Sequence, residues 1–152
     1  MFKIGVFGII TDERQRVLLC HRRDYDLWNL PGGGLIEGES PWNGMVREAK
    51  EETGLDVRLE RLAGVYAKPD QNEIVFSFVC QVVGGRIAVN DEADRIAYFP
   101  LEEIPSHTSP NQVERIRHAL QSGECALKMQ SGPSSIELLR SGKSRTVPLS
   151  PR

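Results

Sequence analysis

The sequence has few cysteines, no long apolar run and no excess of one charge, and each shortage excludes a class of protein. Its three cysteines, Cys20, Cys80 and Cys125, are an odd number at wide spacing, so they favour neither a disulfide framework nor a zinc site. The longest apolar stretch, residues 4–10, is far shorter than the roughly 20 residues that a membrane span needs. The first residues also lack the pattern of a secretory signal. We therefore expect a cytoplasmic protein with no membrane partner.

The charge balance argues against proteins that bind nucleic-acid backbones. The chain has 19 basic and 21 acidic residues, a formal charge of −2, whereas binders of duplex DNA carry a concentrated basic surface. Duplex DNA is therefore not an expected partner. The length of 152 residues and the hydrophobic content of 39% are those of one ordinary domain with its own core.

The first part of the chain predicts two strands followed by a glycine-rich loop. Residues 4–10 and 17–21 are short β-prone runs, separated by a polar segment that is typical of a turn. Residues 24–39 follow, rich in glycine, proline and acidic residues, and they contain Pro31-Gly32-Gly33-Gly34. Because glycine permits tight turns and lets a ligand approach the backbone, this segment is predicted to be a functional loop.

A helix is predicted from Pro41 to the residue before Gly54. Ser40 can cap the free amides at its start, proline is tolerated at the first helical position, and glycine is a natural stop. Helical spacing predicts one buried stripe and one charged face. The predicted buried stripe comprises Trp42, Met45, Val46, Ala49 and Thr53, and the charged face comprises Arg47, Glu48, Glu51 and Glu52.

The second half of the chain predicts further strands and one more helix. Apolar residues alternate through residues 74–83, and Gly84-Gly85 before the β-prone residues 87–89 is a two-residue hairpin signal. Residues 96–99 and 125–129 are strand candidates, and a second helix is predicted to follow a Ser109 cap and to end at Gly123. A helix on each side of a mixed sheet is the simplest packing, so the expected fold class is α/β.

The composition divides the chain into one domain and an extension. Residues 1–123 carry the periodic patterns and are predicted to form the domain. Residues 124–152 are predicted to be a partly ordered C-terminal extension, with a helical turn at residues 136–140 and a flexible basic tail from residue 143.

Four carboxylates gather around the first predicted helix and its loop. Glu48 is three residues from Glu51 and four from Glu52, so their oxygens can converge on one spot, and Glu39 stands in the loop before them. Converging like charges are destabilising unless a cation offsets them. Carboxylates together with a glycine-loop carbonyl suit Mg²⁺ or Mn²⁺. The alternative interpretation is a solvent-exposed acidic helix face, which is the usual meaning of such spacing.

Residues 33–55 resemble the signature of the Nudix hydrolases. That signature has a glycine, a glutamate six residues later, and then Arg-Glu-hydrophobic-x-Glu-Glu-x-Gly-hydrophobic. Its fixed positions are matched by Gly33, Glu39, Arg47, Glu48, Glu51, Glu52 and Gly54, whereas Ala49 is smaller than the aliphatic residue usual at its place. The resemblance continues through residues 28–33 and 98–105, and it covers approximately residues 1–122.

The resemblance implies an α/β/α sandwich with a mixed sheet, in which a loop, a helix and a second loop bind a divalent metal. The implied ligands of Mg²⁺, for which Mn²⁺ can substitute, are Glu48, Glu51, Glu52 and the carbonyl of Gly32. Arg47 is expected to orient a neighbouring carboxylate, and Glu39 to support the loop. The implied reaction is hydrolysis of a nucleoside diphosphate linked to another moiety, by a metal-activated water. The general base is expected to be Glu52 or Glu92.

The substrate stays open between several classes of nucleotide. Arg22 and Arg23 follow the second predicted strand, and similar relatives use a basic residue there to contact substrate phosphate. Four aromatic residues are candidates for stacking on a base, although aromatic residues in strands more often belong to the core. These four are Trp28, Tyr66, Phe76 and Tyr98.

Two further features divide the substrate classes. Pro69, fifteen residues after Gly54, is similar to a proline of some ADP-ribose-hydrolysing relatives, whereas the compact length resembles MutT-type enzymes, which act on nucleoside triphosphates, oxidised ones included. The alternatives are hydrolysis of mRNA caps or dinucleoside polyphosphates, and a nucleotide-sensing module without turnover. A homodimer is expected by analogy with relatives.

Overall fold

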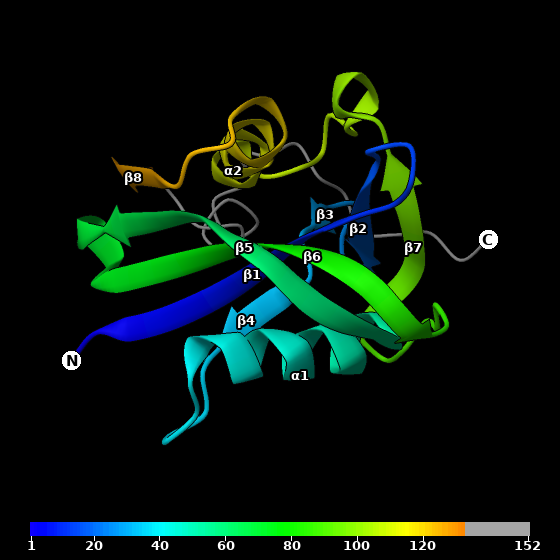
Figure 1. Ribbon diagram of the computed structural model, residues 1–152, viewed down its shortest axis with the longest axis horizontal. Helices are drawn as coiled ribbons and strands as arrows, with labels where there is room; N and C mark the ends of the chain where they lie inside the picture. Colours follow the sequence, from blue (N-terminus) through cyan, green and yellow to red (C-terminus); the bar gives the residue numbers. More distant parts are fainter. Residues whose placement is uncertain (133–152) are drawn as a thin grey trace.

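The apolar alternation of the strands builds one mixed sheet in the computed structural model, which describes residues 1–132 (Figure 1). The strand order is β3-β2-β1-β6-β5-β8, with β4 pairing β1 and β7 pairing β2. The helices are α1 (Pro41–Thr53) and α2 (Pro110–Gln121), and the short 3-10 helices are η1 (Pro69–Gln71) and η2 (Leu101–Glu103). The strands are β1 (Lys3–Thr11), β2 (Val17–Arg22), β3 (Trp28–Asn29), β4 (Gly32–Gly34), β5 (Leu55–Lys68), β6 (Glu73–Gly85), β7 (Ala93–Phe99) and β8 (Ala126–Met129).

The pairing of the strands brings distant segments together around β1. β1 runs parallel to β6 along its whole length and pairs antiparallel with β4, so that Phe7 lies opposite Gly32. β7 runs antiparallel to β2, and this places Ala93 opposite Arg22. The glycine segment is thereby incorporated into the sheet, and the loop before β7 is anchored at the end of β2.

Two apolar cores lie on the two faces of the sheet, as alternation along a covered strand requires. Val6 and Ile10 of β1 pack with Met45 and Ala49 of α1, whereas Ile9 packs with residues of α2 on the other face. Figure 1 shows α1 and α2 on opposite sides of the strands. The expected sandwich with a mixed sheet and a helix on each face is therefore confirmed.

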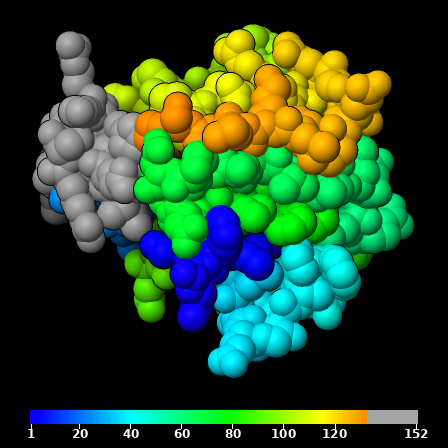
Figure 2. All heavy atoms as spheres, turned by 90° about the vertical axis from the view of Figure 1, so that its left-hand side faces the viewer, coloured from blue at the N-terminus to red at the C-terminus, as the bar shows by residue number. Residues whose placement is uncertain are grey.

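Several local predictions are confirmed at the level of single residues. The Oγ of Ser40 accepts a hydrogen bond from the Asn43 amide at 3.1 Å, and Gly54 ends α1 in the left-handed conformation. The strands expected at residues 4–10, 17–21, 74–83 and 96–99 are present. The strand expected at residues 125–129 is β8, which pairs in parallel with β5; Figure 2 shows it between α2 and the central strands. Cys20 and Cys80 are buried, and Cys125 is exposed.

Two local predictions were wrong, and a third holds only in part. The segment at residues 24–39 is not a continuous loop, because it contains β3 and β4. Gly84-Gly85 does not turn a hairpin into residues 87–89, because these glycines pair with Asp56 and Leu55 at the start of β5, and the Ala88 amide then bonds the Thr53 carbonyl. α2 begins at Pro110 with Ser109 at its N-cap and ends at Gln121, before Gly123, as predicted, but the Ser109 side chain makes no cap hydrogen bond.

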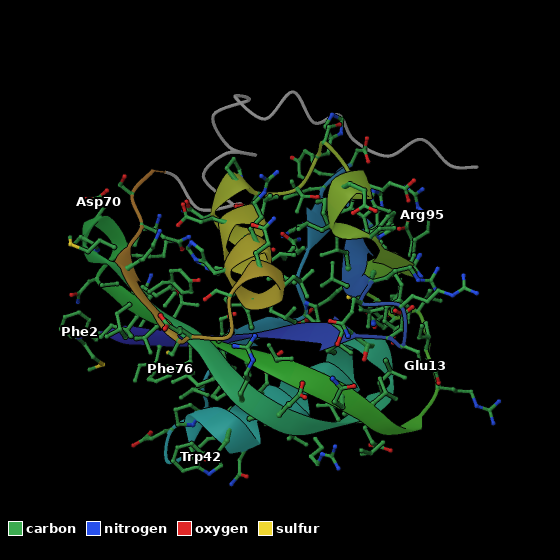
Figure 3. All side chains as sticks on the ribbon, turned by 45° about the horizontal axis from the view of Figure 1, so that its top comes forward. Phe2, Glu13, Trp42, Asp70, Phe76 and Arg95 are labelled. Atoms are coloured by element: carbon green, nitrogen blue, oxygen red, sulfur yellow. The ribbon has the colours of Figure 1, made fainter. Side chains whose placement is uncertain are left out.

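The buried face of α1 also differs from the predicted stripe. Met45, Ala49 and Thr53 are buried as expected, but Trp42 is 60% exposed and Val46 is 41% exposed. Figure 3 shows Trp42 on the outer side of the helix. Gly44 and Glu48 take the inner positions, because the glycine segment and the loop that follows it approach the helix closely on that side.

The predicted helical turn at residues 136–140 and the predicted tail from residue 143 lie outside the described residues. Neither helix of the described range, residues 1–132, is long and apolar enough to cross a membrane.

Two glycines with nearly the same backbone conformation give a matched test of how α1 is joined to the next strand. Gly54 has φ 81° and Gly38 has φ 80°, but a Cβ at Gly54 would overlap the Arg86 carbonyl oxygen, whereas one at Gly38 would meet nothing within 4 Å. Gly38→Ala should lower the free energy of unfolding by about 1–2 kcal/mol, the cost of the left-handed conformation. Gly54→Ala should lower it further. Equal losses in chemical denaturation would show that the Arg86 contact is unimportant.

Candidate active site

The glycine segment approaches α1 closely because Gly33 leaves room for a glutamate. A Cβ on Gly33 would lie 2.8 Å from Oε1 of Glu48, closer than real Cβ atoms come. Glu48 itself is only 8% exposed. A larger residue at position 33 would therefore displace the Glu48 carboxylate from the edge of the sheet.

Arg47 binds the carboxylates of the loop and helix together. Its Nε donates to Oε2 of Glu39 at 2.7 Å and its Nη2 donates to Oε1 at 2.9 Å, so the Glu39 pair is bidentate. Its Nη1 donates to Glu48 at 3.2 Å and to Glu51 at 3.0 Å. Nη2 also reaches the Gly34 carbonyl at 3.2 Å. The planar guanidinium thus fixes the loop to the helix and partly neutralises three carboxylates.

Glu52 is held by the glycine segment and lies outside the reach of Arg47. Its Oε2 accepts a hydrogen bond from the Gly32 amide at 2.9 Å. Burial, and after it the charges of Glu48 and Glu92, raise the pKa of Glu52 to about 8. The hydrogen bond from Gly32 acts in the opposite direction and lowers this pKa. Burial likewise raises the pKa of Glu48, although Arg47 opposes the shift. Negative charge in this part of the site is therefore incompletely compensated.

The loop before β7 faces these glutamates from the opposite side. Asn90 donates from Nδ2 to the Glu52 carbonyl at 2.7 Å, and its Oδ1 accepts from the amides of Glu92 and Ala93 at 2.9 and 3.0 Å. Arg23 holds the same loop by donating from Nε to the Asn90 carbonyl at 2.6 Å. Asn90 and Arg23 thereby fix Glu92 across from α1.

An acidic cavity of about 380 Å³ lies between these elements. Five carboxylates line it, together with Gly32, Gly33 and Asn90. The five belong to Glu48, Glu51, Glu52, Asp91 and Glu92. The structure thus brings together Gly32, the three glutamates of α1 and the loop residue Glu92, all of which the sequence singled out.

The carboxylate oxygens that line the acidic cavity suit a divalent cation by their charge and by their ligand chemistry. Among residues 1–132, no three or more histidine, cysteine or acidic side chains are already gathered at one point as a metal site. Glu48 and Glu51 turn toward Arg47, and Glu52 turns toward the Gly32 amide. All the carboxylate ligands are nevertheless hard oxygens, and burial first and the charges of Glu48 and Glu92 second raise the pKa of Glu52, so a cation would stabilise its ionised form.

A second, larger cavity of about 660 Å³ shares Gly32, Glu52 and residues 90–92 with the acidic cavity and extends toward α2. Arg22 and Arg23 line it, as does Asp24, which accepts a bidentate pair from Arg22 at 2.8 Å. Both arginines predicted to contact substrate therefore lie on the wall of this larger cavity, although each is already engaged by a neighbouring acceptor.

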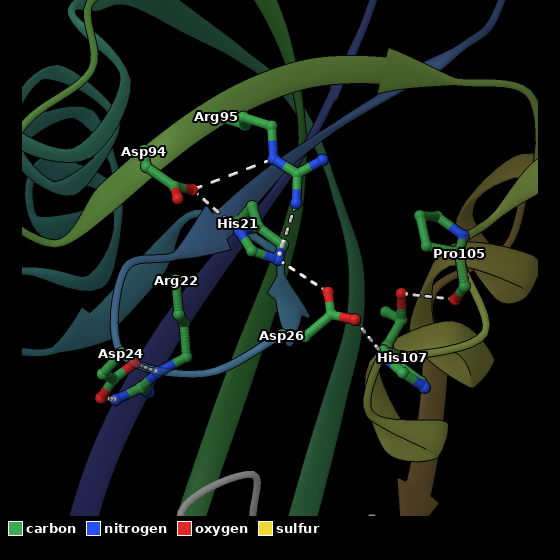
Figure 4. A network of polar contacts seen from close by, with 9 residues as sticks. His21, Arg22, Asp24, Asp26, Asp94, Arg95, Pro105 and His107 are labelled. Carbon is green, nitrogen blue, oxygen red and sulfur yellow. Dashed lines mark hydrogen bonds and ion pairs between the residues drawn. The ribbon is translucent and has the colours of Figure 1, made fainter. Parts of the chain in front are cut away.

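A buried histidine ties the surrounding loops together (Figure 4). His21 is fully buried, and its Nδ1 and Nε2 lie 2.8 Å from Asp94 and Asp26. Asp26 also contacts Nδ1 of His107 at 2.8 Å, and the hydrogen bond from His21 is the main reason that its pKa is lowered. The network joins the loop after β2, the start of β7 and the segment before α2. Of these residues His21 lines the larger cavity, and the others hold segments that adjoin its lining.

The aromatic candidates from the sequence belong to the core or its edge. Trp28 packs edge-on against His21 and Phe99, Tyr66 is fully buried against His118, and Phe76 packs against the α1 core. Tyr98 is half-buried under Arg16. The aromatic residue that lines the larger cavity within the described residues is Phe7, which sequence reasoning missed. Asn90, His21 and Arg115 were also missed as site residues, because their partners are distant in sequence.

The family model and the similar proteins agree on one family. The family model described as the NUDIX domain matches residues 1–121. A Bacillus subtilis protein provisionally named 8-oxo-dGTP diphosphatase is 31% identical over 92% of this chain and 97% of its own length. An ADP-ribose pyrophosphatase of Methanocaldococcus jannaschii is 35% identical over 67% of this chain and 64% of its own length.

Solved structures share the fold. The crystal structure of an ADP-ribose pyrophosphatase from Streptococcus suis matches with a TM-score of 0.71 and 26% identity, over 86% of this chain and 100% of that chain. A NUDIX hydrolase structure from Nitrosomonas europaea matches with a TM-score of 0.76 and 23% identity, over 86% of this chain and 79% of that chain. This second likeness supports the fold alone.

The environment of Glu52 predicts a pH-dependent stability of the metal-free protein. Below pH 4.5 the carboxyl is protonated in both states, and above about pH 8 it is ionised in both. Between these values the folded protein retains a proton that the unfolded chain releases, so the free energy of unfolding should fall as pH rises. Glu52→Gln should flatten this part of the profile, measured by urea denaturation with a chelator.

Glu13→Gln is the matched control, because it removes an exposed carboxylate between β1 and β2. It should leave the slope between pH 4.5 and 8 unchanged. A slope that persists in Glu52→Gln would mean that Glu52 is not the carboxyl whose pKa is raised in the folded protein.

Proposed function

The chain belongs to the NUDIX family and is a hydrolase of phosphoric anhydride bonds, and we propose that it is a Mg²⁺-dependent pyrophosphohydrolase acting on a nucleoside triphosphate or a nucleoside diphosphate derivative. The observation that carries the proposal is the acidic cavity, where five carboxylates face one space of about 380 Å³ beside a glycine segment. A solvent-exposed acidic helix face would not account for the burial of Glu48 or for the raised pKa of Glu52.

We assign the metal to the α1 side of this cavity. Glu48, Glu51, Glu52 and the Gly32 carbonyl would hold it, and Mn²⁺ would be accepted by the same oxygens. When bound, the metal supplies neutralisation of the diphosphate and a lowered pKa of an attacking water. Arg47 is a positioning residue, because it holds Glu48 and Glu51 near the glycine segment.

The proton of the attacking water would be removed by one of two carboxylates. Glu52 faces the cavity from α1, where the Gly32 amide holds its carboxylate, and a bound cation would keep that carboxylate ionised. Glu92 faces the cavity from the loop before β7 and is positioned by Asn90. Arg22 and Arg23 would contact substrate phosphate from the wall of the larger cavity.

The substrate classes follow from the relatives and from the available space. The relatives are named for an oxidised nucleoside triphosphate and for ADP-ribose, and a cavity of about 660 Å³ has the size of sites for such ligands. We further propose that residues 1–123 supply the catalytic unit and that residues 124–152 extend it.

The direct test is a product assay with a substrate panel. The purified full chain would be incubated with Mg²⁺ and with ADP-ribose, dinucleoside polyphosphates, nucleotide sugars, and normal and oxidised nucleoside triphosphates, and products would be separated by chromatography. Metal-dependent cleavage of one class supports the proposal and shows which phosphorus is attacked. Nucleotide binding without cleavage of any compound would contradict it and favour a nucleotide-sensing module.

Two isosteric variants should separate metal binding from proton removal. Glu52→Gln should weaken Mg²⁺ activation and lower kcat by about 10²-fold or more. If Glu92 is the base, Glu92→Gln should lower kcat by about 10²-fold while the Mg²⁺ concentration for half-activation stays unchanged. Steady-state kinetics over a Mg²⁺ series give both quantities.

The matched control for these variants is Glu102→Gln, which removes an exposed carboxylate of η2. It should leave kcat and Mg²⁺ activation unchanged. Full turnover in Glu52→Gln would remove Glu52 from the mechanism, and full turnover in Glu92→Gln would leave Glu52 as the candidate base.

A further inference from the structure

A buried arginine lines the larger cavity at the α2 side, and no residue in the described part of the chain forms an ion pair with it. Arg115 is only 3% exposed, and its guanidinium carbon lies 5.3 Å from the ring centre of Phe7 and 5.5 Å from that of Tyr66. Its Nε donates to Oε1 of Gln130 at 3.0 Å. Within residues 1–132, neither Nη atom has a hydrogen bond or a carboxylate within ion-pair distance. Two strong donors are therefore unused at the wall of a cavity.

The fixed position of Arg115 makes these donors directional. Gln130 is itself held, because its Nε2 donates to the Asn111 carbonyl at 3.0 Å and to Glu114 at 3.1 Å. With Nε bonded to Gln130 and the guanidinium lying over the rings of Phe7 and Tyr66, the Nη atoms have little freedom to turn. A ligand in the cavity would meet a preset pair of donors.

Two carboxamides stand beside Arg115 on the same wall. Gln112, one helical turn earlier, uses Oε1 to accept from the Leu30 amide at 2.7 Å, and its Nε2 has no acceptor among residues 1–132. Asn29, the neighbour of Leu30, has a buried Oδ1 with no hydrogen-bond partner among the described residues. This wall therefore offers donors from Arg115 and Gln112. The Asn29 carboxamide can turn either its oxygen or its nitrogen toward a ligand by a 180° rotation.

The surroundings favour a flat and uncharged ligand group over a second anion. The half-buried ring of Phe7 and the side chain of Leu30 give the wall an apolar surface. Glu73 lines the same end of the cavity, and its charge together with that of Glu114 already acts favourably on the Arg115 guanidinium. Glu73 is also paired with Lys68 of the same cavity at 3.5 Å, so the charges at this end largely offset one another, and a neutral heteroaromatic ring fits there without adding a further charge.

We propose that this wall, formed by Phe7, Asn29, Gln112 and Arg115, is a nucleobase site that selects 6-oxopurines. The two Nη donors of Arg115 match the adjacent acceptors O6 and N7 of such a base. Adenine presents a donor, its 6-amino group, at the same place, and would leave two donors facing each other. Uracil and thymine place a donor, the N3 proton, between their two carbonyl oxygens, and in cytosine the paired acceptors N3 and O2 lie on a smaller ring next to the glycosidic bond. The inference rests on the proposed function, because it places the base of the nucleotide whose diphosphate lies at the acidic cavity.

The most direct probe is the pair inosine triphosphate and ATP. Their purines differ only in that the first has a 6-oxo group and a proton on N1, whereas the second has a 6-amino group and no proton on N1. The full chain should hydrolyse inosine triphosphate with a kcat/KM at least about 5-fold above that for ATP. Equilibrium binding of inosine diphosphate and ADP, measured by calorimetry without turnover, should show the same preference.

Matched variants on one helix test the residue assignment. Arg115→Gln should bring the ratio of inosine triphosphate to ATP close to 1, mainly by raising KM for inosine triphosphate. Arg117→Gln removes the same charge from the exposed side of α2 and should leave the ratio unchanged. Gln112→Glu keeps the acceptor for the Leu30 amide but replaces the free donor with an acceptor, so it should lower the ratio without loss of folding.

The outcomes distinguish the base site from the proposed function. Equal hydrolysis and equal binding of the two purines, or a preference for adenine, would overturn the base site and leave the hydrolase proposal standing. A preference for inosine diphosphate in binding, with no hydrolysis of any compound in the panel, would support the base site and contradict the hydrolase proposal. An unchanged ratio in Arg115→Gln, with thermal unfolding near that of the unmodified chain, would remove Arg115 from base selection.

Discussion

Mutual repulsion among carboxylates is the constraint around which this site is arranged. Helical spacing places Glu48, Glu51 and Glu52 within one turn, and the structure offsets part of their charge with a single guanidinium, that of Arg47. Arg47 reaches Glu48 and Glu51 but not Glu52, which is left to the Gly32 amide. The remaining unfavourable charge is what makes the acidic cavity suitable for a cation, because a fully compensated cluster would gain little from binding one.

The glycine segment makes this arrangement compatible with a packed sheet. It pairs with β1 as a strand, and its missing side chain at Gly33 admits Glu48 to a nearly buried position. The same close approach turns α1 so that Gly44 faces inward and Trp42 faces outward. The contacts of the glycine segment and of the loop after it with α1 thus accompany both the position of an acidic ligand candidate and the buried face of the helix that carries it.

The sequence predicted the parts of the site that are local and missed those that depend on distant contacts. The caps of α1 and the spacing of its glutamates lie within a few residues, so helical periodicity was sufficient to predict them. The inward position of Gly44 depends on Leu35 and Glu39, which approach it closely. The pairing of Gly84-Gly85 with β5 depends on strand register across the sheet, which local turn propensity does not contain. His21 joins Asp94, 73 residues away, and no pattern in either segment indicates the other.

The contact between Gln130 and Arg115 has a consequence for how such a protein can diverge. Gln130 follows β8 and lies beyond residues 1–121, the part of the chain that matches the family model, yet it orients a guanidinium on the wall of the larger cavity. Substitutions in this C-terminal segment can therefore alter the cavity without touching α1, the glycine segment or the loop before β7. One hydrogen bond from outside the matched range can thus adjust the direction of a guanidinium that lies inside it, so sequence change after α2 has a route to the cavity wall.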